Sequence, residues 1–334
     1  MGFVYYRVYG LTIRSSRLIP GLISIERNSF PRVAISFEGL PPWFSGSFLT
    51  ESQATLVEQF PFLAVTLYRT PTDRYWHFSY ANHIEYLVKN DGQEIWVSWR
   101  PPVTLANVCV YLFGPVFARV LHLQGRTPLH ASTVVIDGLA VAFLGPPEAG
   151  KSTTAAKFAQ LGYGVLAEDV LNLLPDENEF KATPGYPVIR LWPQSLEILR
   201  GLPEISTDGT PGLNKLCLDS RLGAYRFEGE PKALAAIYVL KGRAEDERAP
   251  YIEALEPHVA LLELLANILG QSVVDSEGRA RNFAFLARLA RAVPLRRMIP
   301  HCNPDRLQRM SELIAEDFRK QVVPRWKIRA EAHV

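Results

Sequence analysis

Residues 139–160 read LAVAFLGPPEAGKSTTAAKFAQ, an apolar run followed by a glycine-bearing loop and a helix-forming stretch. The loop, Gly145–Ser152, fits the phosphate-binding pattern G-x-x-x-x-G-K-[S/T]. In such a loop Gly150 lets the main chain approach phosphate oxygens, Lys151 brings a positive charge to them, and Ser152 offers a hydroxyl group to Mg²⁺. The N–H groups and the dipole of the following helix favour anions at the same point. We therefore expect ATP and Mg²⁺ here, with nucleotide contacts from Gly145, Glu148, Ala149, Gly150, Lys151, Ser152 and Thr153.

Two features of this loop reduce its capacity to hold anions. Pro146 and Pro147 have no N–H group, so the entrance of the loop has fewer hydrogen-bond donors. Glu148 places a carboxylate in a loop meant for phosphate groups. We expect the Glu148 side chain to point away from the phosphates or to pair with a cation, because like charges repel.

Two carboxylates follow the loop helix at the end of the next strand. Glu168 and Asp169 come directly after the short apolar run Val165–Ala167. A carboxylate at this place can hold Mg²⁺ against the β and γ phosphates, and a second can serve the nucleophile. Because neighbours on a strand point to opposite sides, both reach the site only if the strand ends there. His130, just before the strand that leads into the loop, is a further candidate.

The segments around the loop predict an α/β fold. Asp137-Gly138 joins two apolar runs, Ser132–Ile136 and Leu139–Leu144, and is a strong signal for a hairpin turn. The second run enters the loop, a helix is expected over Lys151–Leu161, and the strand Val165–Ala167 follows. This strand–loop–helix–strand order is the unit that an α/β nucleotide-binding fold requires.

Further helices are expected on both sides of this unit. Apolar residues spaced by three or four predict a helix over Thr104–Gln124, which Gly114-Pro115 should kink. Downstream, the sequence predicts a buried strand and then three helices, over Leu234–Leu240, Pro257–Leu269, Arg281–Val293 and Pro304–Lys320.

Residues 1–103 differ in composition from the rest of the chain. They are rich in β-branched and aromatic residues between turn-forming segments. Strands are expected at Val33–Phe37, Phe62–Tyr68, Trp76–Tyr80 and Ile95–Trp99. We interpret 1–103 as a β-rich accessory or substrate-recognition domain, and 104–334 as the catalytic domain with C-terminal helices.

Composition narrows the classes of partner. The 334 residues are 48% hydrophobic, enough for a packed core, and the formal net charge of +2 gives no reason to expect nucleic acid. The most apolar run, Val108–Ala118, is too short to span a membrane. Three widely separated cysteines form no C-x-x-C pair, which favours a reducing cytoplasm over a disulfide or zinc framework.

The segment LHASTVVIDGLAVAFLGPPEAGKSTTAAKFAQLGYGVLAEDV, residues 129–170, resembles the catalytic core of the HPr serine kinase family. That family shares its fold with the ATP-dependent phosphoenolpyruvate carboxykinases. PGYPVIRLWPQSLEIL (184–199), LNKLCLD (213–219) and LAAIYVL (234–240) resemble a shorter, divergent branch. Members of that branch include kinases that phosphorylate the C-terminal serine of lasso peptide precursors. The resemblance covers roughly residues 104–300.

The resemblance implies roles for individual residues. Lys151 and Ser152 match the phosphate and Mg²⁺ residues of the family. Glu168 matches the first of two aspartates, the base for the substrate hydroxyl group, and His130 matches its partner. Asp169 matches the second aspartate and would serve the metal, although the residues alone leave the order of the two carboxylates open.

Arg190 and Lys215 are weaker candidates for contacts with phosphate or substrate. The resemblance implies an ATP- and Mg²⁺-dependent serine kinase acting on a peptide or small protein, with a tendency to form homo-oligomers. Two other functions stay open, a nucleotide-binding regulatory module with little transfer activity and a kinase of small-molecule hydroxyl groups. The sequence does not identify the acceptor.

Overall fold

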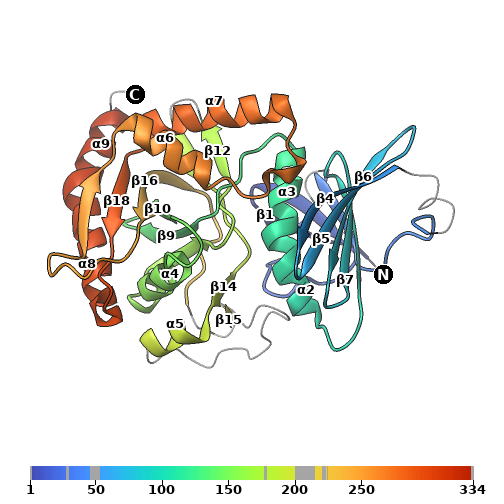
Figure 1. Ribbon diagram of the computed structural model, residues 1–334, viewed down its shortest axis with the longest axis horizontal. Helices are drawn as coiled ribbons and strands as arrows, with labels where there is room; N and C mark the ends of the chain where they lie inside the picture. The colour runs from blue at the N-terminus through green and yellow to red at the C-terminus, as the bar shows by residue number, and fades with distance from the viewer. Residues whose placement is uncertain are drawn as a thin grey trace.

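The computed structural model describes residues 2–27, 30–45, 53–176, 179–199, 215–219, 223 and 225–331. The molecule has two large β-sheets, one in each half, and a kinked helix lies between them (Figure 1). The architecture is mixed α/β, as the sequence predicts. Residues 213 and 214 of the segment LNKLCLD lie outside the described residues.

The N-terminal sheet has eight strands in the order β1-β2-β3-β8-β7-β6-β5-β4. Alternating burial along its strands turns one face toward the core, as in β5, where every second residue is buried. The four strands expected in this region are present, as β3, β5, β6 and β8, and the other four were not predicted. The strands are β1 Val4–Val8, β2 Leu11–Ser15, β3 Val33–Ser36, β4 Gln53–Phe60, β5 Leu63–Arg69, β6 Arg74–Tyr80, β7 Ile84–Lys89 and β8 Glu94–Trp99.

The kinked helix covers the buried face of this sheet. It consists of α2 (Leu105–Tyr111), a π-helical segment (Leu112–Val116) and α3 (Phe117–Leu123), with non-helical backbone angles at Gly114. Thr104 begins it with a capping box that includes Asn107. The helix shares one core with the N-terminal sheet, although the predicted boundary at 103/104 assigns it to the other part. Leu105–Leu123 is long and apolar enough to cross a membrane, but 83% of its apolar window is buried inside the protein.

The second sheet carries the glycine-bearing loop. β10 pairs with β9 in the expected hairpin, and it runs parallel to β16, which in turn runs parallel to β18. β11 pairs with β9, β17 with β18, and β13 and β12 extend from the start of β16. These strands are β9 Ser132–Ile136, β10 Leu139–Leu144, β11 Gly164–Ala167, β12 Leu173–Asp176, β13 Glu179–Ala182, β16 Lys232–Leu240, β17 Tyr251–Ala254 and β18 Leu295–Ile299. A separate pair is formed by β14 Val188–Leu191 and β15 Leu216–Asp219.

Helices cover both faces of the second sheet. On one face lie α4 (Lys151–Gln160) and α8 (Leu307–Asp317); on the other lie α6 (Pro257–Ala266) and α7 (Ser276–Ala292). The loop helix and the C-terminal helices are therefore confirmed, except that α7 begins five residues before the expected Arg281, where Asp275 caps it. Shorter elements complete the chain, α5 Pro193–Ile198, the 3₁₀ turns Gln271–Val273 and Pro304–Arg306, a second π-helical segment Phe318–Val322, and α9 Val323–Glu331.

Packing beneath α4 holds the loop helix to its sheet. Phe158 of α4 is fully buried, and its ring centroid lies 5.4 Å from that of Phe143 in β10. Phe158→Ala should lower the free energy of unfolding by about 3–5 kcal/mol, because it removes a large buried side chain and leaves a cavity. Urea denaturation followed by circular dichroism measures this loss.

Phe283→Ala is the matched control, since Phe283 on α7 is 52% exposed. It should change the free energy of unfolding by less than about 0.5 kcal/mol. Equal effects of the two substitutions would contradict the packing described for α4.

Candidate active site

Gly145 begins the loop in a position that only glycine fits. Its φ is +147°, and a Cβ atom there would lie 2.5 Å from the carbonyl oxygen of Leu240 in β16. Asn267, just after α6, accepts a hydrogen bond from the Gly145 N–H group at 3.3 Å. The loop therefore lies directly against the ends of two neighbouring parallel strands.

Gly150 and Lys151 form the junction of the loop with α4. Gly150 has a φ of +101° and is the residue from which the helix starts. The Lys151 ammonium group donates to the carbonyl oxygens of Gly145 (2.8 Å) and Pro146 (3.0 Å). These contacts hold the positive charge over the loop, where a phosphate oxygen would compete for it. Glu148 is exposed and has a φ of +65°.

The two carboxylates after β11 point in different directions. The strand ends at Ala167, and Asp169 has a left-handed backbone with a φ of +66°. Glu168 lies against the start of α4, where the Ser152 hydroxyl group donates to its Oε1 at 2.6 Å. Both carboxylates therefore reach the region of the loop, as expected if the strand ends there.

Asp169 lies on the other side, with His130 and Arg190. Its Oδ2 accepts from Arg190 Nη2 at 2.5 Å, and its Oδ1 lies 3.4 Å from His130 Nδ1. His130 Nδ1 is also 3.1 Å from the main-chain oxygen of Asp169. The expected pairing of His130 with Glu168 is wrong, because the turn at Asp169 brings the second carboxylate, and not the first, to the histidine.

Burial and neighbouring charges separate the two carboxylates electrostatically. Burial raises the pKa of Glu168 to about 7, and the negative charge of Asp169 acts in the same direction. Burial is the largest single influence on Asp169 and would raise its pKa, but the positive charges around it, first that of Arg190, together lower that pKa below its usual value. Burial lowers the pKa of His130, although Asp169 opposes the change.

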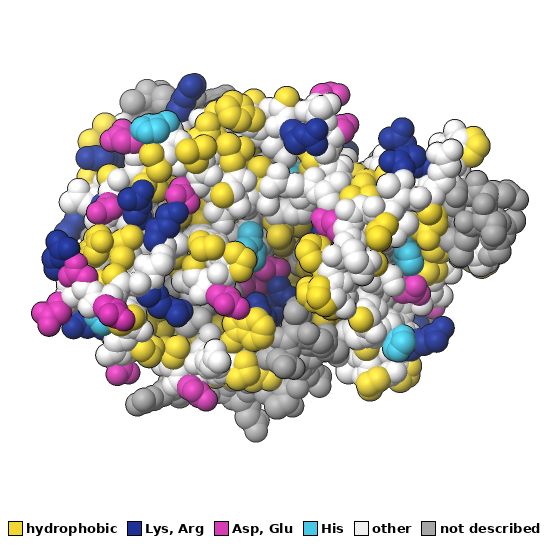
Figure 2. Space-filling view, in the orientation of Figure 1, with side chains coloured by type: hydrophobic (Ala, Val, Ile, Leu, Met, Phe, Trp, Pro, Cys, Tyr) yellow, Lys and Arg dark blue, Asp and Glu magenta, His cyan; other side chains and the backbone are white. Residues whose placement is uncertain are grey.

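A cavity of about 550 Å³ opens at these residues. It brings together most of the residues that the sequence singled out, and Figure 2 shows histidine, acidic and basic side chains gathered in the hollow in the middle of the molecule. Among the lining residues are His130, Glu148, Gly150, Lys151, Ser152, Thr153, Asp169, Arg190 and Lys215. Glu168 is not among them. A second cavity of about 170 Å³ continues past Ala149 and shares Gly150, Thr153, Ile198 and Arg243 with the first.

The two weaker candidates differ in their surroundings. Arg190 of β14 is buried and engaged by Asp169, so its charge is already directed at a carboxylate. Lys215 lines the cavity, and its ammonium group lies 5.1 Å from the centre of the Trp192 ring. Of the two, Lys215 has the freer charge for a ligand.

The N-terminal half contributes to the site through Gly114 and Tyr9. A Cβ atom at Gly114 would lie 3.1 Å from Asp169 Oδ2, so the absence of a side chain at this glycine leaves room for the carboxylate. Tyr9 donates to the main-chain oxygen of Phe113 at 2.5 Å, and a small cavity beside it is lined by both Glu168 and Asp169. The kinked helix therefore contributes to the site through Gly114. The sequence predicts the kink but does not indicate that it lies at the site.

The oxygen ligands present suit a magnesium ion. Mg²⁺ is usually held by one or two carboxylates together with substrate phosphates and water. Ser152 and Glu168 place a hydroxyl group and a carboxylate within 2.6 Å of each other at the start of α4, and Asp169 is the next residue. Within the described part of the chain no group of three or more His, Cys, Asp and Glu residues could hold a metal, so protein ligands alone would not enclose one.

Arg243 is a lining residue that the sequence analysis missed. It follows β16, and β16 runs parallel to β10, so both strands end at the same edge of the sheet. Ligands of open α/β sheets bind at this edge. A search for charged residues just after the predicted strand Leu234–Leu240 would have found Arg243.

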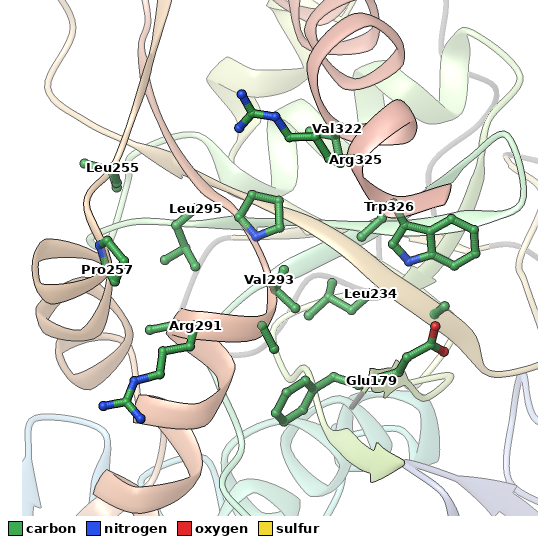
Figure 3. A pocket seen from close by; sticks show the side chains of 16 residues that line it. Glu179, Leu234, Leu255, Pro257, Arg291, Val293, Leu295, Val322, Arg325 and Trp326 are labelled. Carbon is green, nitrogen blue, oxygen red and sulfur yellow. The ribbon is translucent and has the colours of Figure 1, made fainter. Parts of the chain in front are cut away.

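A further cavity, of about 260 Å³, lies away from these residues between α7, α9 and the starts of β16 and β18. Figure 3 shows apolar side chains such as Leu234, Val293 and Leu295 in its middle, with the guanidinium groups of Arg291 and Arg325 turned outward. It lacks the convergent polar groups of the loop cavity, which is therefore the candidate active site.

The sequence matches no protein-family model and no curated protein. The structure is similar to that of the Hpr(Ser) kinase/phosphatase from Coxiella burnetii, with a TM-score of 0.32 and 15% identity, over 62% of this chain and 96% of that chain. At this TM-score the likeness says nothing about the chemistry of the present chain.

The close approach at Gly145 can be tested through stability. Gly145→Ala should destabilise the protein more than Gly162→Ala does. Both glycines have positive φ, but a Cβ atom at Gly162 would meet nothing within 4 Å. The backbone alone should cost Gly162→Ala about 1–2 kcal/mol, and the contact with Leu240 should add to this at Gly145. Thermal and urea unfolding measure both; equal losses would show that the contact contributes nothing.

Proposed function

We propose that this protein is an ATP- and Mg²⁺-dependent phosphotransferase that phosphorylates a hydroxyl group, and that its acceptor is a serine of a peptide or small protein. The observation that carries the proposal is the meeting of Lys151, Ser152, Asp169 and His130 in one cavity of about 550 Å³ at the start of α4. Phosphoryl transfer needs anion-binding groups, metal ligands and a base in this arrangement.

Lys151 and the N–H groups at the start of α4 would bind the β and γ phosphates. The smaller cavity past Ala149, which shares Arg243 with the larger one, offers room for the nucleoside. Ser152 and Glu168 would hold Mg²⁺, which would supply positive charge to the phosphate oxygens when bound. This assignment follows their hydrogen bond and reverses the order of the two carboxylates that the family resemblance implies.

Asp169 would accept the proton of the acceptor, since it lines the cavity and Glu168 does not. The hydroxyl oxygen forms a bond to the γ phosphorus, and the bond from that phosphorus to the β–γ bridging oxygen breaks. ADP leaves with the electron pair, and the proton passes to the Asp169 carboxylate. Arg190 and His130 would hold this carboxylate in place.

A serine of a peptide or small protein is the acceptor that we propose. Its support is the sequence resemblance to peptide serine kinases, including those of lasso peptide precursors, together with a cavity that Trp192, Gln194 and Ser195 widen beyond the loop. A small-molecule hydroxyl kinase would use the same residues on the nucleotide. A nucleotide-binding regulatory module would bind ATP at the loop without transferring phosphate.

Transfer from γ-labelled ATP with Mg²⁺ to serine-containing peptides tests the proposal directly. Wild-type protein should label peptide serine. Labelled small molecules in a metabolite extract, with no labelled peptide, would assign the acceptor to the small-molecule class. Tight ATP binding with no transfer to either class would support the regulatory module.

Substitution of the two carboxylates separates their roles. Asp169→Asn should lower turnover by about 10²–10⁴-fold, because it removes the base, and should leave Mg²⁺-dependent ATP binding nearly unchanged. Glu168→Gln should raise the Mg²⁺ concentration required for ATP binding and for turnover. Steady-state kinetics and calorimetric titration at several Mg²⁺ concentrations measure both effects.

Asp176→Asn is the control for removal of a carboxylate. The Asp176 side chain is exposed, and within the described part of the chain its one ion-pair partner is Lys181. The variant should behave as wild type. If instead Glu168→Gln abolishes turnover with an unchanged Mg²⁺ requirement, and Asp169→Asn stays active, then Glu168 is the base.

Lys151→Ala should weaken ATP binding by roughly 10–100-fold, because a hydrogen bond to a charged group contributes about 1.5–3 kcal/mol. Turnover should fall together with binding. Lys157→Ala, two turns further along α4, serves as the control and should bind ATP normally. Unchanged ATP affinity in Lys151→Ala would mean that this loop does not bind the phosphates.

A further inference from the structure

Four arginines surround a cavity that shares no lining residue with the active site. The cavity has a volume of about 350 Å³ and lies between the N-terminal sheet, the end of α3 and the start of α7. Arg69 and Arg74 come from β5 and β6, Arg126 follows α3, and Arg281 lies on α7. Figure 2 shows basic side chains over the β5–β6 turn and over the neighbouring end of α7.

Arg69 and Arg74 are placed directly opposite each other in the ladder of β5 and β6. Like charges in this position repel and destabilise a strand pair. Arg69 donates to the Thr55 hydroxyl group at 2.7 Å, which leaves its charge uncompensated. Within the described residues, Arg69, Arg74 and Arg126 form no ion pair with a carboxylate. An anion between the two strands and α7 would relieve this repulsion.

The first two turns of α7 border the same cavity and, among the described residues, add one free donor to it, the Asn282 amide. Asp275 caps the helix through the Gly278 N–H group at 2.7 Å, and both residues line the cavity. Asn282, two turns along, is only 5% exposed. Its Oδ1 accepts from the Thr127 hydroxyl group at 2.9 Å, but its Nδ2 finds no acceptor among the residues that the structure describes. A buried amide donor without a partner is costly, and a ligand oxygen would satisfy it.

The remaining titratable groups do not cancel this positive charge. His122 contacts the main-chain oxygen of Leu269 at 2.8 Å, and burial lowers its pKa to about 4, so the ring is neutral at pH 7. Arg281 pairs with Glu277, which lies outside the cavity and is 82% exposed in its side chain, so solvent screens that pair. Asp275 is the one carboxylate among the lining residues, against four arginines.

We propose that this cavity binds a small organic polyanion, one that carries two or more carboxylate or phosphoryl groups. Guanidinium groups bind such oxygens through paired hydrogen bonds, and the Asn282 amide would donate to a third oxygen. Because the lining comes from the N-terminal sheet and from α7, the bound anion also holds these two parts together. The proposal is independent of the proposed phosphotransferase activity.

Calorimetric titration of the full-length protein with citrate and with inorganic diphosphate, at low ionic strength, tests the proposal. At least one of these probes should bind saturably. Arg74→Gln and Asn282→Asp should each weaken binding by roughly 10–100-fold, because each loses a hydrogen bond to a charged group. Asn282→Asp keeps the side-chain shape and can still accept from Thr127, but it places a negative charge beside the anion.

Two further variants separate this site from the rest of the surface and from the loop. Arg7→Gln removes an exposed arginine on β1 that does not line the cavity, and it should bind the probe as wild type does. Lys151→Ala removes a charge from the active-site cavity and should retain citrate binding. A failure of the phosphotransferase proposal would therefore leave these results unchanged.

Three outcomes of these titrations with small probes would overturn the proposal, and a fourth comes from a peptide probe. The first is that neither probe binds saturably. The second is that wild type, Arg74→Gln and Asn282→Asp bind the probe equally well. The third is that Lys151→Ala loses citrate binding. Binding of a hexaglutamate peptide in place of both small probes would also overturn it, and would assign the cavity to an acidic peptide.

Discussion

The ion pair of Asp169 with Arg190 lies where the N-terminal sheet, the kinked helix and the loop-bearing sheet meet. Both side chains are largely buried, and a buried charge without its partner destabilises a protein by several kcal/mol. The surrounding chain is arranged to accept this pair. Gly114 leaves space beside the carboxylate, and β14 brings the arginine to it from the other side. The relative positions of the two halves thus depend on a contact inside the candidate active site.

The same ion pair gives the two adjacent carboxylates, Glu168 and Asp169, different electrostatic environments. Asp169 contacts Arg190 and His130, whereas Glu168 accepts a hydrogen bond from the Ser152 hydroxyl group, and burial is the largest influence on its pKa. Their pKa values consequently move in opposite directions, with that of Glu168 raised and that of Asp169 lowered. Two carboxylates in different environments can carry different roles. The division of metal binding and proton transfer that we propose rests on the hydrogen bond of Glu168 with Ser152 and on the place of Asp169 in the cavity lining.

Local signals in the sequence predicted the elements nearest the loop. Asp137-Gly138 predicted the hairpin of β9 and β10 with the bounds that the structure has, and Gly114-Pro115 predicted the kink of the long helix. Both signals act through backbone angles of the residues themselves, so they need no distant partner. β18 was missed: Leu295–Ile299 contains two arginines in five residues, and it becomes a strand because it pairs with β16.

The features of the site likewise fall into two groups, those that a local sequence pattern predicts and those that depend on residues distant in the sequence. The glycines, lysine and serine of the loop follow from the sequence pattern, and the cavity brings most of them together. The partner of His130 could not be predicted, because it depends on the left-handed turn at Asp169. The space that Gly114 leaves for the Asp169 carboxylate depends on residues from separate halves of the chain, and no local signal marks it.

The arginines that line the two polar cavities differ in their ion-pair partners. In the candidate active site Arg190 is buried against a carboxylate of the protein itself, so its charge is compensated without a ligand. Around the cavity beside α7, Arg69 and Arg74 face each other in a strand ladder, and a buried amide donor lies nearby without an acceptor. Solubility alone does not require two arginines to face each other across a strand pair, because charged residues can be dispersed over the surface. Their convergence on one cavity is better explained by an anion that the protein does not supply.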